Sequence, residues 1–237
     1  MKENNIVVKD LKTVLNVFAA LYSKQTNKHT NNNMALYGQP SYWEERYTKD
    51  PEPFDWYQRY EQLRDILRSV IPVTSNILIP GCGNSRLTED MLSDGFGPIT
   101  NVDISKVVID TMSARHKDKA NCVWQVMNVM QMNFPDASFD AVIDKGTLDS
   151  LLCGDSSTTN SARYLQEIAR VLKPGGVFVA ISYGTPENRV QYFEGEEYNW
   201  RLTMKTVPKP IISATGQLDA ADPTQNHFIY ILMKTQR

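Results

Sequence analysis

The chain of 237 residues has few cysteines, no long apolar run and almost no net charge, and each absence excludes a class of protein. Its 3 cysteines, Cys82, Cys122 and Cys153, lack the spacing of metal ligands, and an odd number does not complete a disulfide framework. The formal net charge of -2 gives no basic field of the kind that attracts nucleic acid. No apolar stretch approaches the roughly 18 residues of a membrane span. We therefore expect a globular protein of the reducing cytoplasm, with no metal and no direct nucleic-acid or membrane partner.

The first 33 residues differ in composition from the rest of the chain. Apolar residues recur at near-helical spacing from Val7 to Leu21, which indicates an amphipathic helix. Residues 23–33 are polar and rich in asparagine, which is typical of a linker. Charged residues interrupt the apolar core that a secretory signal needs, and the segment lacks the arginines of a mitochondrial presequence. We expect a helix and linker over residues 1–33 and one α/β domain over residues 34–237.

Through most of the chain, segments whose apolar residues have the spacing of a strand alternate with segments whose apolar residues have the spacing of a helix. Strands are expected at 76–80, 99–103, 122–127, 139–144, 176–183, 198–206 and 227–234. Helices are expected from Ser41, along an apolar face between Leu63 and Val70, and at 85–93, 105–116 and 160–172. This alternation predicts a parallel sheet with helices on both faces. The last two strands have no helix between them, so they should form an antiparallel pair at the edge of the sheet.

A glycine turn follows the first strand of this alternating region. The apolar run 77–80 ends at Gly81-Cys82-Gly83, and a second run begins eighteen residues after Gly81 and ends at Asp103. Strand, glycine turn, helix, strand and acid is the arrangement of a nucleotide-type cofactor site. The third glycine of a dinucleotide fingerprint is absent, and no Gly-Lys-Ser/Thr sequence ends the turn as in a phosphate-binding loop. The pattern therefore indicates a cofactor without a pyrophosphate clamp.

The ordered set of motifs resembles the class I, S-adenosylmethionine-dependent methyltransferases over about residues 40–234. Its signs are the glycine turn, Asp103, the strand 139–144, and the segment 169–176 before the next strand. The resemblance implies a Rossmann-like sheet of seven strands, mostly parallel with a C-terminal antiparallel strand. It also implies that S-adenosylmethionine is the cofactor and that residues 34–237 are a methyltransferase domain.

Four shorter strings resemble one branch of these enzymes, the lysine methyltransferases that act on translation elongation factor 1-alpha. They are Tyr42-Trp43-x-x-Arg46-Tyr47, Asp55-Trp56, Gly81-Cys82-Gly83-Asn84-Ser85 and Asp144-Lys145-Gly146-Thr147-Leu148-Asp149. The resemblance implies transfer of methyl groups to a lysine ε-amine of a protein substrate such as elongation factor 1-alpha. A small-molecule methyltransferase with the same cofactor site, or a non-catalytic adaptor, remains an alternative.

Several roles at the cofactor follow from the resemblance. Gly81 and Gly83 would let the loop pass beneath the methionine and ribose, where the alternative is a plain turn. Asp103 would accept hydrogen bonds from both ribose hydroxyls; the alternative is a helix N-cap, which Ser105 could supply instead. Ile104 would lie against the adenine.

Two residues after the third strand would complete the adenine site. Related enzymes usually carry an acid at the position of Asn128, and the amide oxygen here would accept from the adenine amino group. Val129 would contribute a backbone group.

Aromatic residues and one lysine are expected to enclose the cofactor. Trp43, Tyr47 and Trp56 would cover the sulfonium cation, whereas the alternative is a hydrophobic staple that holds a helix to the domain. Lys145 would contact the cofactor through its backbone or stem, with a solvated lysine as the alternative.

The acids of the 144–149 segment are the candidate catalytic groups. Asp144 and Asp149 could steer an incoming ammonium group or take its proton, while helix capping by Thr147 or Asp149 is the competing interpretation. Cys82 is expected to pack as a small buried residue, because methyl transfer needs no covalent enzyme intermediate.

Overall fold

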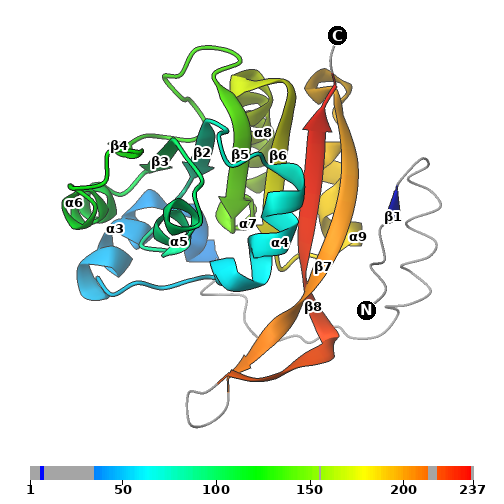
Figure 1. The fold of residues 1–237 in the computed structure, drawn as a ribbon. Coiled ribbons are helices and arrows are strands. Elements are labelled where there is room, and N and C mark those ends of the chain that lie inside the picture. Colours follow the sequence, from blue (N-terminus) through cyan, green and yellow to red (C-terminus); the bar gives the residue numbers. More distant parts are fainter. Residues whose placement is uncertain (1–5, 8–34, 155, 213–217, 236–237) are drawn as a thin grey trace.

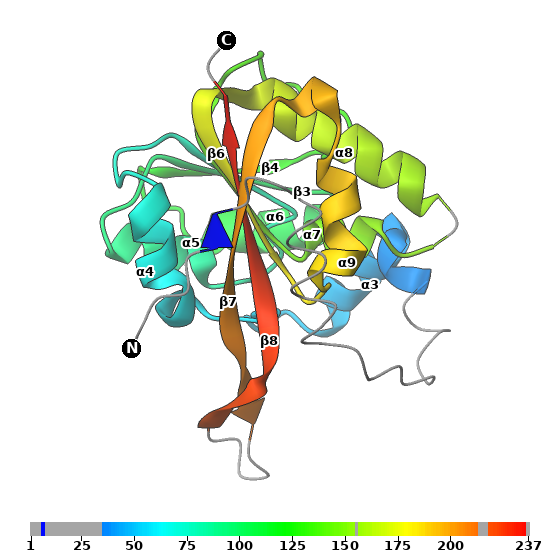
Figure 2. The same cartoon turned by 90° about the vertical axis from the view of Figure 1, so that its right-hand side faces the viewer.

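The computed structural model describes residues 6–7, 35–154, 156–212 and 218–235 of the chain. Seven strands form a twisted sheet that is covered by helices on both faces (Figures 1 and 2). The strands are β2 (Ile77–Pro80), β3 (Ile99–Asp103), β4 (Cys122–Val126), β5 (Phe139–Lys145), β6 (Leu172–Ser182), β7 (Trp200–Ile212) and β8 (Leu218–Lys234). A further two-residue strand, β1 (Ile6–Val7), pairs antiparallel with β7.

The order of strands across the sheet is β1-β7-β8-β6-β5-β2-β3-β4. The pairs among β2 to β6 are parallel, and β8 runs antiparallel to both β6 and β7. The predicted sheet, with one antiparallel strand near the C-terminus, is therefore confirmed. From β2 the chain adds β3 and β4 on one side of the sheet and then β5 and β6 on the other side, so the strand order switches between β2 and β5. A ligand crevice is expected beyond the carboxyl ends of the strands at such a switch point.

Helices connect the strands. They are α3 (Pro40–Lys49), α4 (Tyr60–Val70), α5 (Leu87–Ser93), α6 (Lys106–Arg115), α7 (Thr147–Leu151), α8 (Ser157–Val171) and α9 (Pro186–Arg189). Short 3-10 turns lie at η1 (Ala35–Gly38), η2 (Val190–Phe193) and η3 (Glu196–Tyr198). In the part of the chain that the structure describes, no helix is both long and apolar enough to cross a membrane.

Alternating residues of the strands build a separate hydrophobic core on each face of the sheet. Ile77 and Ile79 of β2 point to the face covered by α4, α5 and α6, where they pack with residues such as Leu63 and Met91. Leu78 points to the opposite face, where α8 packs against the sheet. Strands of a parallel sheet are buried on both faces, which explains their continuous apolar runs.

The structure corrects the expected elements at three places. The strand expected from residue 176 begins already at Leu172 in β6, where Phe139 pairs with Leu172 whereas Ala141 pairs with Val177, and the extra residues bulge out of the ladder. The helix α7 was not predicted, since its 5 residues are too few to show helical spacing. Ile6–Val7 form a strand where a helix was expected, and the rest of that helix and its linker lie outside the described residues. The domain boundary at residue 34 stays a prediction.

The hairpin of β7 and β8 is longer than the other strands. It extends past the body of the sheet at the end toward which the arrow of β5 points (Figure 1). This is the carboxyl end of the parallel strands, so the hairpin projects on the side where a ligand crevice is expected.

Candidate active site

A cavity of about 410 Å³ opens at the carboxyl ends of the parallel strands. This volume lies in the usual range of small-molecule and cofactor sites. Of the predicted site residues, eleven line this cavity: Trp43, Tyr47, Trp56, Gly81, Gly83, Asp103, Ile104, Asn128, Val129, Lys145 and Asp149. They come from α3 and the segment after it, from the carboxyl ends of β3 and β5, from the loops after β2, β3 and β4, and from α7. The topology thus brings together residues that lie far apart in the sequence.

The two positions in the first loop require glycine for two reasons, a left-handed backbone conformation and side chains that lie too close for a Cβ atom. Gly81 and Gly83 have φ of +62° and +54°, a conformation that favours glycine. A Cβ at Gly81 would lie 2.1 Å from Thr147 Oγ1, and one at Gly83 would lie 2.7 Å from Tyr47 Oη. The glycines therefore let α7 and α3 approach the loop, which shapes the wall of the cavity.

Asp103 is a buried carboxylate held by backbone amides at the end of β3. It is 5% exposed; its Oδ2 accepts from the Gly83 amide at 2.9 Å and its Oδ1 from the Ser105 amide at 3.0 Å. Burial raises its pKa to about 6, although these amide donors favour the charged form. Ser105 is the N-cap residue of α6, since its hydroxyl accepts from the Val108 amide. Because Ser105 caps the helix, Asp103 is left to hold the loop and face the cavity.

The residues expected at adenine line one side of the cavity. Ile104 is 38% exposed, so a large apolar side chain faces the cavity and solvent. Asn128 is exposed, and its Oδ1 accepts from the Met130 amide at 3.0 Å. Its neighbour Val129 is buried. An apolar face beside an amide side chain suits a flat heterocycle with polar edges.

Lys145 is a buried anchor at the carboxyl end of β5, which makes the solvated alternative wrong. Its side chain is 5% exposed, and Nζ lies 3.1 Å from Asp55 Oδ1 and donates to the Trp56 carbonyl at 3.1 Å. Burial lowers its pKa, while the charge of Asp55 opposes this shift. The ion pair thereby ties the segment after α3 to the central strand of the sheet.

The Asn84-Ser85 end of the glycine motif holds the same segment from the other side. The amide nitrogen of Asn84 donates to the Glu52 carbonyl at 2.5 Å, and the hydroxyl of Ser85 donates to Asp55. Residues 50–57, which we call the cover segment, are therefore fixed to both β5 and the glycine loop.

Aromatic rings stack into one cluster over the cavity. Trp43 stacks on Tyr47 at 5.9 Å and meets Trp56 edge-to-face at 6.3 Å. Tyr37 joins them, since its carbonyl accepts from the indole of Trp43 at 2.8 Å. These rings line the cavity and also pack on one another, which agrees with the stapling interpretation, while their covering of the cofactor stays a prediction.

The two candidate catalytic acids lie in different surroundings. Asp144 is not part of the cavity lining; its carboxylate accepts from the Thr147 and Leu148 amides and the Tyr164 hydroxyl. Burial raises its pKa to about 7. Asp144 therefore accepts from the first amides of α7, whereas the competing interpretation assigned the capping to Thr147 or Asp149, and it lies away from the cavity.

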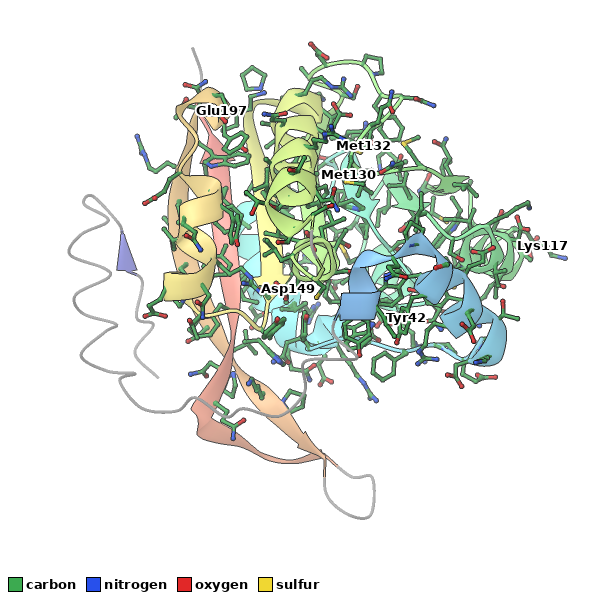
Figure 3. The ribbon with its side chains drawn as sticks, turned by 180° about the vertical axis from the view of Figure 1, so that it is seen from behind. Tyr42, Lys117, Met130, Met132, Asp149 and Glu197 are labelled. Atoms are coloured by element: carbon green, nitrogen blue, oxygen red, sulfur yellow. The ribbon has the colours of Figure 1, made fainter. Side chains whose placement is uncertain are left out.

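Asp149 does line the cavity, and it is paired. Its Oδ1 accepts from Arg189 Nε at 2.9 Å and from the Ser182 hydroxyl at 2.6 Å, and its Oδ2 accepts from the Tyr183 amide at 3.2 Å. Figure 3 shows Asp149 near the middle of the molecule, whereas Lys117 lies at the periphery. These contacts hold the Asp149 carboxylate in one orientation at the cavity wall.

Cys82 is packed as expected. It is 6% exposed, and burial raises the pKa of its thiol, so the nucleophilic thiolate is disfavoured.

Sequence reasoning missed four aromatic residues of the lining: Tyr37, Phe54, Tyr57 and Tyr183. One signal could have found Tyr183, because it directly follows β6 and the ends of parallel strands meet at one edge. Tyr57 adjoins the Asp55-Trp56 string, but nothing in its local pattern distinguishes it from a core residue.

The cavity suits S-adenosylmethionine by the chemistry of its lining. A carboxylate at a strand end can accept from two vicinal hydroxyls, an exposed apolar side chain follows it, and aromatic faces are available to a cation. The residues that would hold the cofactor are therefore present in one cavity.

Comparison with known proteins agrees with this geometry. Residues 78–180 match the model of a family described as a methyltransferase domain. The chain is 33% identical over 180 residues to mouse (Mus musculus) EEF1A lysine methyltransferase 4, covering 72% of this chain and 71% of the relative. It is 35% identical over 184 residues to the Xenopus laevis eEF1A lysine and N-terminal methyltransferase, covering 75% of this chain and 26% of that longer protein.

Solved structures show the same fold. The Burkholderia thailandensis 1,6-didemethyltoxoflavin-N1-methyltransferase, solved with bound S-adenosylhomocysteine, superposes with a TM-score of 0.61 at 16% identity. The superposition covers 90% of this chain and 94% of that chain. With the fold, the cavity and the relatives in agreement, the chain belongs to the class I S-adenosylmethionine-dependent methyltransferases, in the branch that contains EEF1A lysine methyltransferase 4.

Proposed function

We propose that this methyltransferase transfers methyl groups to a lysine ε-amine of translation elongation factor 1-alpha in the cytoplasm. The observation that carries this proposal is the 33% identity to EEF1A lysine methyltransferase 4 across 71% of that protein. The matched strings support it, because Asn84, Ser85, Asp55 and Lys145 together fix the cover segment over the cavity.

We assign the cofactor to the residues predicted for it. Asp103 holds the ribose hydroxyls, Ile104 and Val129 border the adenine, and the amide of Asn128 faces its polar edge. Trp43, Tyr47 and Trp56 cover the charged sulfur and exclude water, while Gly81 and Gly83 keep the loop clear of the ligand. When bound, S-adenosylmethionine supplies a methyl group that is already activated, so the protein mainly aligns the acceptor nitrogen.

The acceptor amine must be neutral to react, and the cavity favours that state. A free lysine has a pKa near 10.4, and desolvation lowers it. The chain's own Lys145 illustrates this effect, since burial in the same wall lowers its pKa. We assign Asp149 to orienting the amine rather than to taking its proton, because Arg189 and Ser182 already engage its carboxylate. Asp144 supports α7 in this scheme.

The test is methylation of purified elongation factor 1-alpha by the purified full chain with radiolabelled S-adenosylmethionine. We expect label in the factor, mapped by mass spectrometry to a lysine, and loss of the label when that lysine is replaced by arginine. The matched control is Asp103→Asn, which should lower the rate at limiting cofactor.

Two results would contradict the proposal. Label from a cell extract that appears in small molecules alone would favour a small-molecule methyltransferase. Absence of both label and cofactor binding by calorimetry would favour an adaptor.

A further inference from the structure

Tyr57 occupies a strained turn at the edge of the cavity. Its φ is +65°, which is uncommon for a residue other than glycine. The Gln58 amide donates to the Trp56 carbonyl at 2.8 Å, so the three residues form a γ-turn of the unfavourable hand. Such strain persists where surrounding contacts impose it, and it occurs often at ligand sites.

Contacts on both sides impose this turn. Before Tyr57, the Trp56 carbonyl is held by Lys145 Nζ. After it, the Gln58 side-chain amide donates to the Pro208 carbonyl of β7 at 2.8 Å and lies 3.0 Å from His227 Nδ1 of β8. Gln58 is 1% exposed. Buried partners from three strands thus fix the direction of one tyrosine ring.

The ring of Tyr57 connects solvent to the interior of the cavity. Gly146 makes room for it, since a Cβ there would lie 3.1 Å from Tyr57 Cε2. Its centroid lies 6.0 Å from that of Tyr183, which is 41% exposed. Asp149, also in the lining, is 3% exposed. These three residues, which we call the acceptor port, run from the surface inward.

The chemistry of the acceptor port suits a primary amine on an apolar stem. Burial and the nearby charge of Asp149 raise the pKa of Tyr57, so its hydroxyl stays protonated and offers oxygen lone pairs to an N–H donor. Arg189, Ser182 and the Tyr183 amide fix Asp149, so its charge cannot turn away. An exposed aromatic ring such as Tyr183 can cover the methylenes of a lysine stem.

We propose that the acceptor port receives the substrate lysine, with Tyr183 against its stem and the Tyr57 hydroxyl hydrogen-bonded to its ε-nitrogen. This inference rests on the proposed lysine acceptor and adds the residues that bind it. Tyr57 touches the acceptor atom and is a catalytic residue in that sense. Asp149 acts through Tyr57 and through its charge, and it is a positioning residue.

The first test compares Tyr57→Phe with Tyr60→Phe, a matched control in which the lost hydroxyl also lies beside an aspartate, 2.5 Å from Asp94. For Tyr57→Phe we expect kcat on elongation factor 1-alpha to fall about tenfold, the scale of one hydrogen bond to a charged or reacting group. Cofactor affinity by calorimetry should stay within about twofold. The product should shift toward more methyl groups per lysine, because the lost hydroxyl leaves room beside the nitrogen. Wild-type kcat and product distribution in Tyr57→Phe would overturn the proposal.

A second variant tests the acceptor port independently, in case Tyr57→Phe does not fold. Tyr183→Ala removes an exposed ring, so the fold should tolerate it, as thermal unfolding would confirm. We expect KM for the protein substrate to rise about fivefold with a smaller change in kcat, because the ring contacts the stem and not the nitrogen. An unchanged KM would contradict the role of Tyr183.

A third measurement separates this inference from the identity of the substrate. The wild-type protein with ring-labelled tyrosines is titrated with n-butylamine, an amine with the stem of lysine, and followed by NMR. We expect the signals of Tyr57 and Tyr183 to shift while that of Tyr60 does not. If the wild type fails to methylate elongation factor 1-alpha but these shifts appear, the proposed function fails and the acceptor port stands. If methylation occurs and neither tyrosine shifts across the titration, the proposed function stands and the acceptor port is refuted.

Discussion

The two ends of the parallel sheet carry the same kind of ion pair in opposite surroundings. At the carboxyl end, Lys145 of β5 pairs with Asp55, and the two side chains are 5% and 10% exposed. At the amino end, Lys173 of β6 pairs with Asp140, and the side chains are 41% and 40% exposed.

The difference in burial distinguishes ion pairs that hold the site together from ion pairs that lie in solvent at the surface. A buried charge is costly unless it is paired, so a buried pair fixes the two elements that it joins. A half-exposed pair gains little over two hydrated ions. The ion pair at the carboxyl end therefore positions a segment of the site, whereas loss of the ion pair at the amino end should change the stability of the fold little.

The largest effect is expected from removing one partner of the buried pair. Lys145→Met leaves Asp55 without its cation and should lower the free energy of unfolding by about 3 kcal/mol or more. Lys173→Met, the same change in the neighbouring strand, should cost less than about 1 kcal/mol. Urea denaturation of both variants measures the difference. Equal losses would show that burial does not distinguish the two ends.

A smaller effect is expected at the ribose acid of the site end. Asp103→Asn should weaken S-adenosylmethionine binding by about 1.5–3 kcal/mol, the scale of hydrogen bonds to a charged group. The control is Asp110→Asn on α6, where the side chain is 61% exposed and pairs with Lys106; its affinity should match the wild type. Isothermal calorimetry gives both values, and equal affinities in the two variants would remove Asp103 from the site.

The same acid should make cofactor binding depend on pH. Burial raises the pKa of Asp103 to about 6, and ribose hydroxyls donate to its charged form. Affinity should therefore be level above pH 6 and fall toward roughly tenfold per pH unit below it. The stability of the ligand-free protein should change in the opposite direction and fall as the pH rises from about 3.8 to about 6. In this range the folded state binds more protons than the unfolded state, in which Asp103 has its ordinary pKa of 3.8. Calorimetry from pH 5 to 8 should show no such fall in Asp103→Asn.

The smallest effect is expected from the cysteines at the two ends. Cys82 follows β2 at the site end and is buried, whereas Cys122 begins β4 at the opposite end and is partly exposed. Burial raises the pKa of the Cys82 thiol, so iodoacetamide should modify Cys122 at least about tenfold faster. Cys82→Ala should keep turnover within about twofold. Rapid loss of activity through alkylation of Cys82 would give this thiol a role that packing does not explain.

Much of the fold and half of the site follow from local sequence patterns. Gly81 and Asp103 are recognisable because each sits at the end of an apolar strand, and strand ends meet at one edge of a parallel sheet. Ser105 as a helix cap follows from its position in the same way. Such features depend on a few adjacent residues, so the sequence alone reveals them.

The remaining features depend on distant partners and could not be predicted. Lys145 is singled out by the resemblance, but its ion pair with Asp55, ninety positions earlier, is seen only in the folded chain. Tyr57 becomes notable through its left-handed backbone and through Gln58, whose partners lie on β7 and β8. The capping role of Asp144 required α7, which is too short to leave a periodic signal.

The anchoring of the cover segment has a consequence for the rate at which ligands exchange. Residues 50–57 cannot lift from the cavity without separating Lys145 from Asp55 and breaking the Asn84 and Ser85 contacts at the same time. Partial opening would leave charges unpaired in the interior, so the segment opens as a unit or not at all. Entry and release of ligands through this side therefore share one concerted barrier, which is set by the contacts of the cover segment to β5 and to the glycine loop.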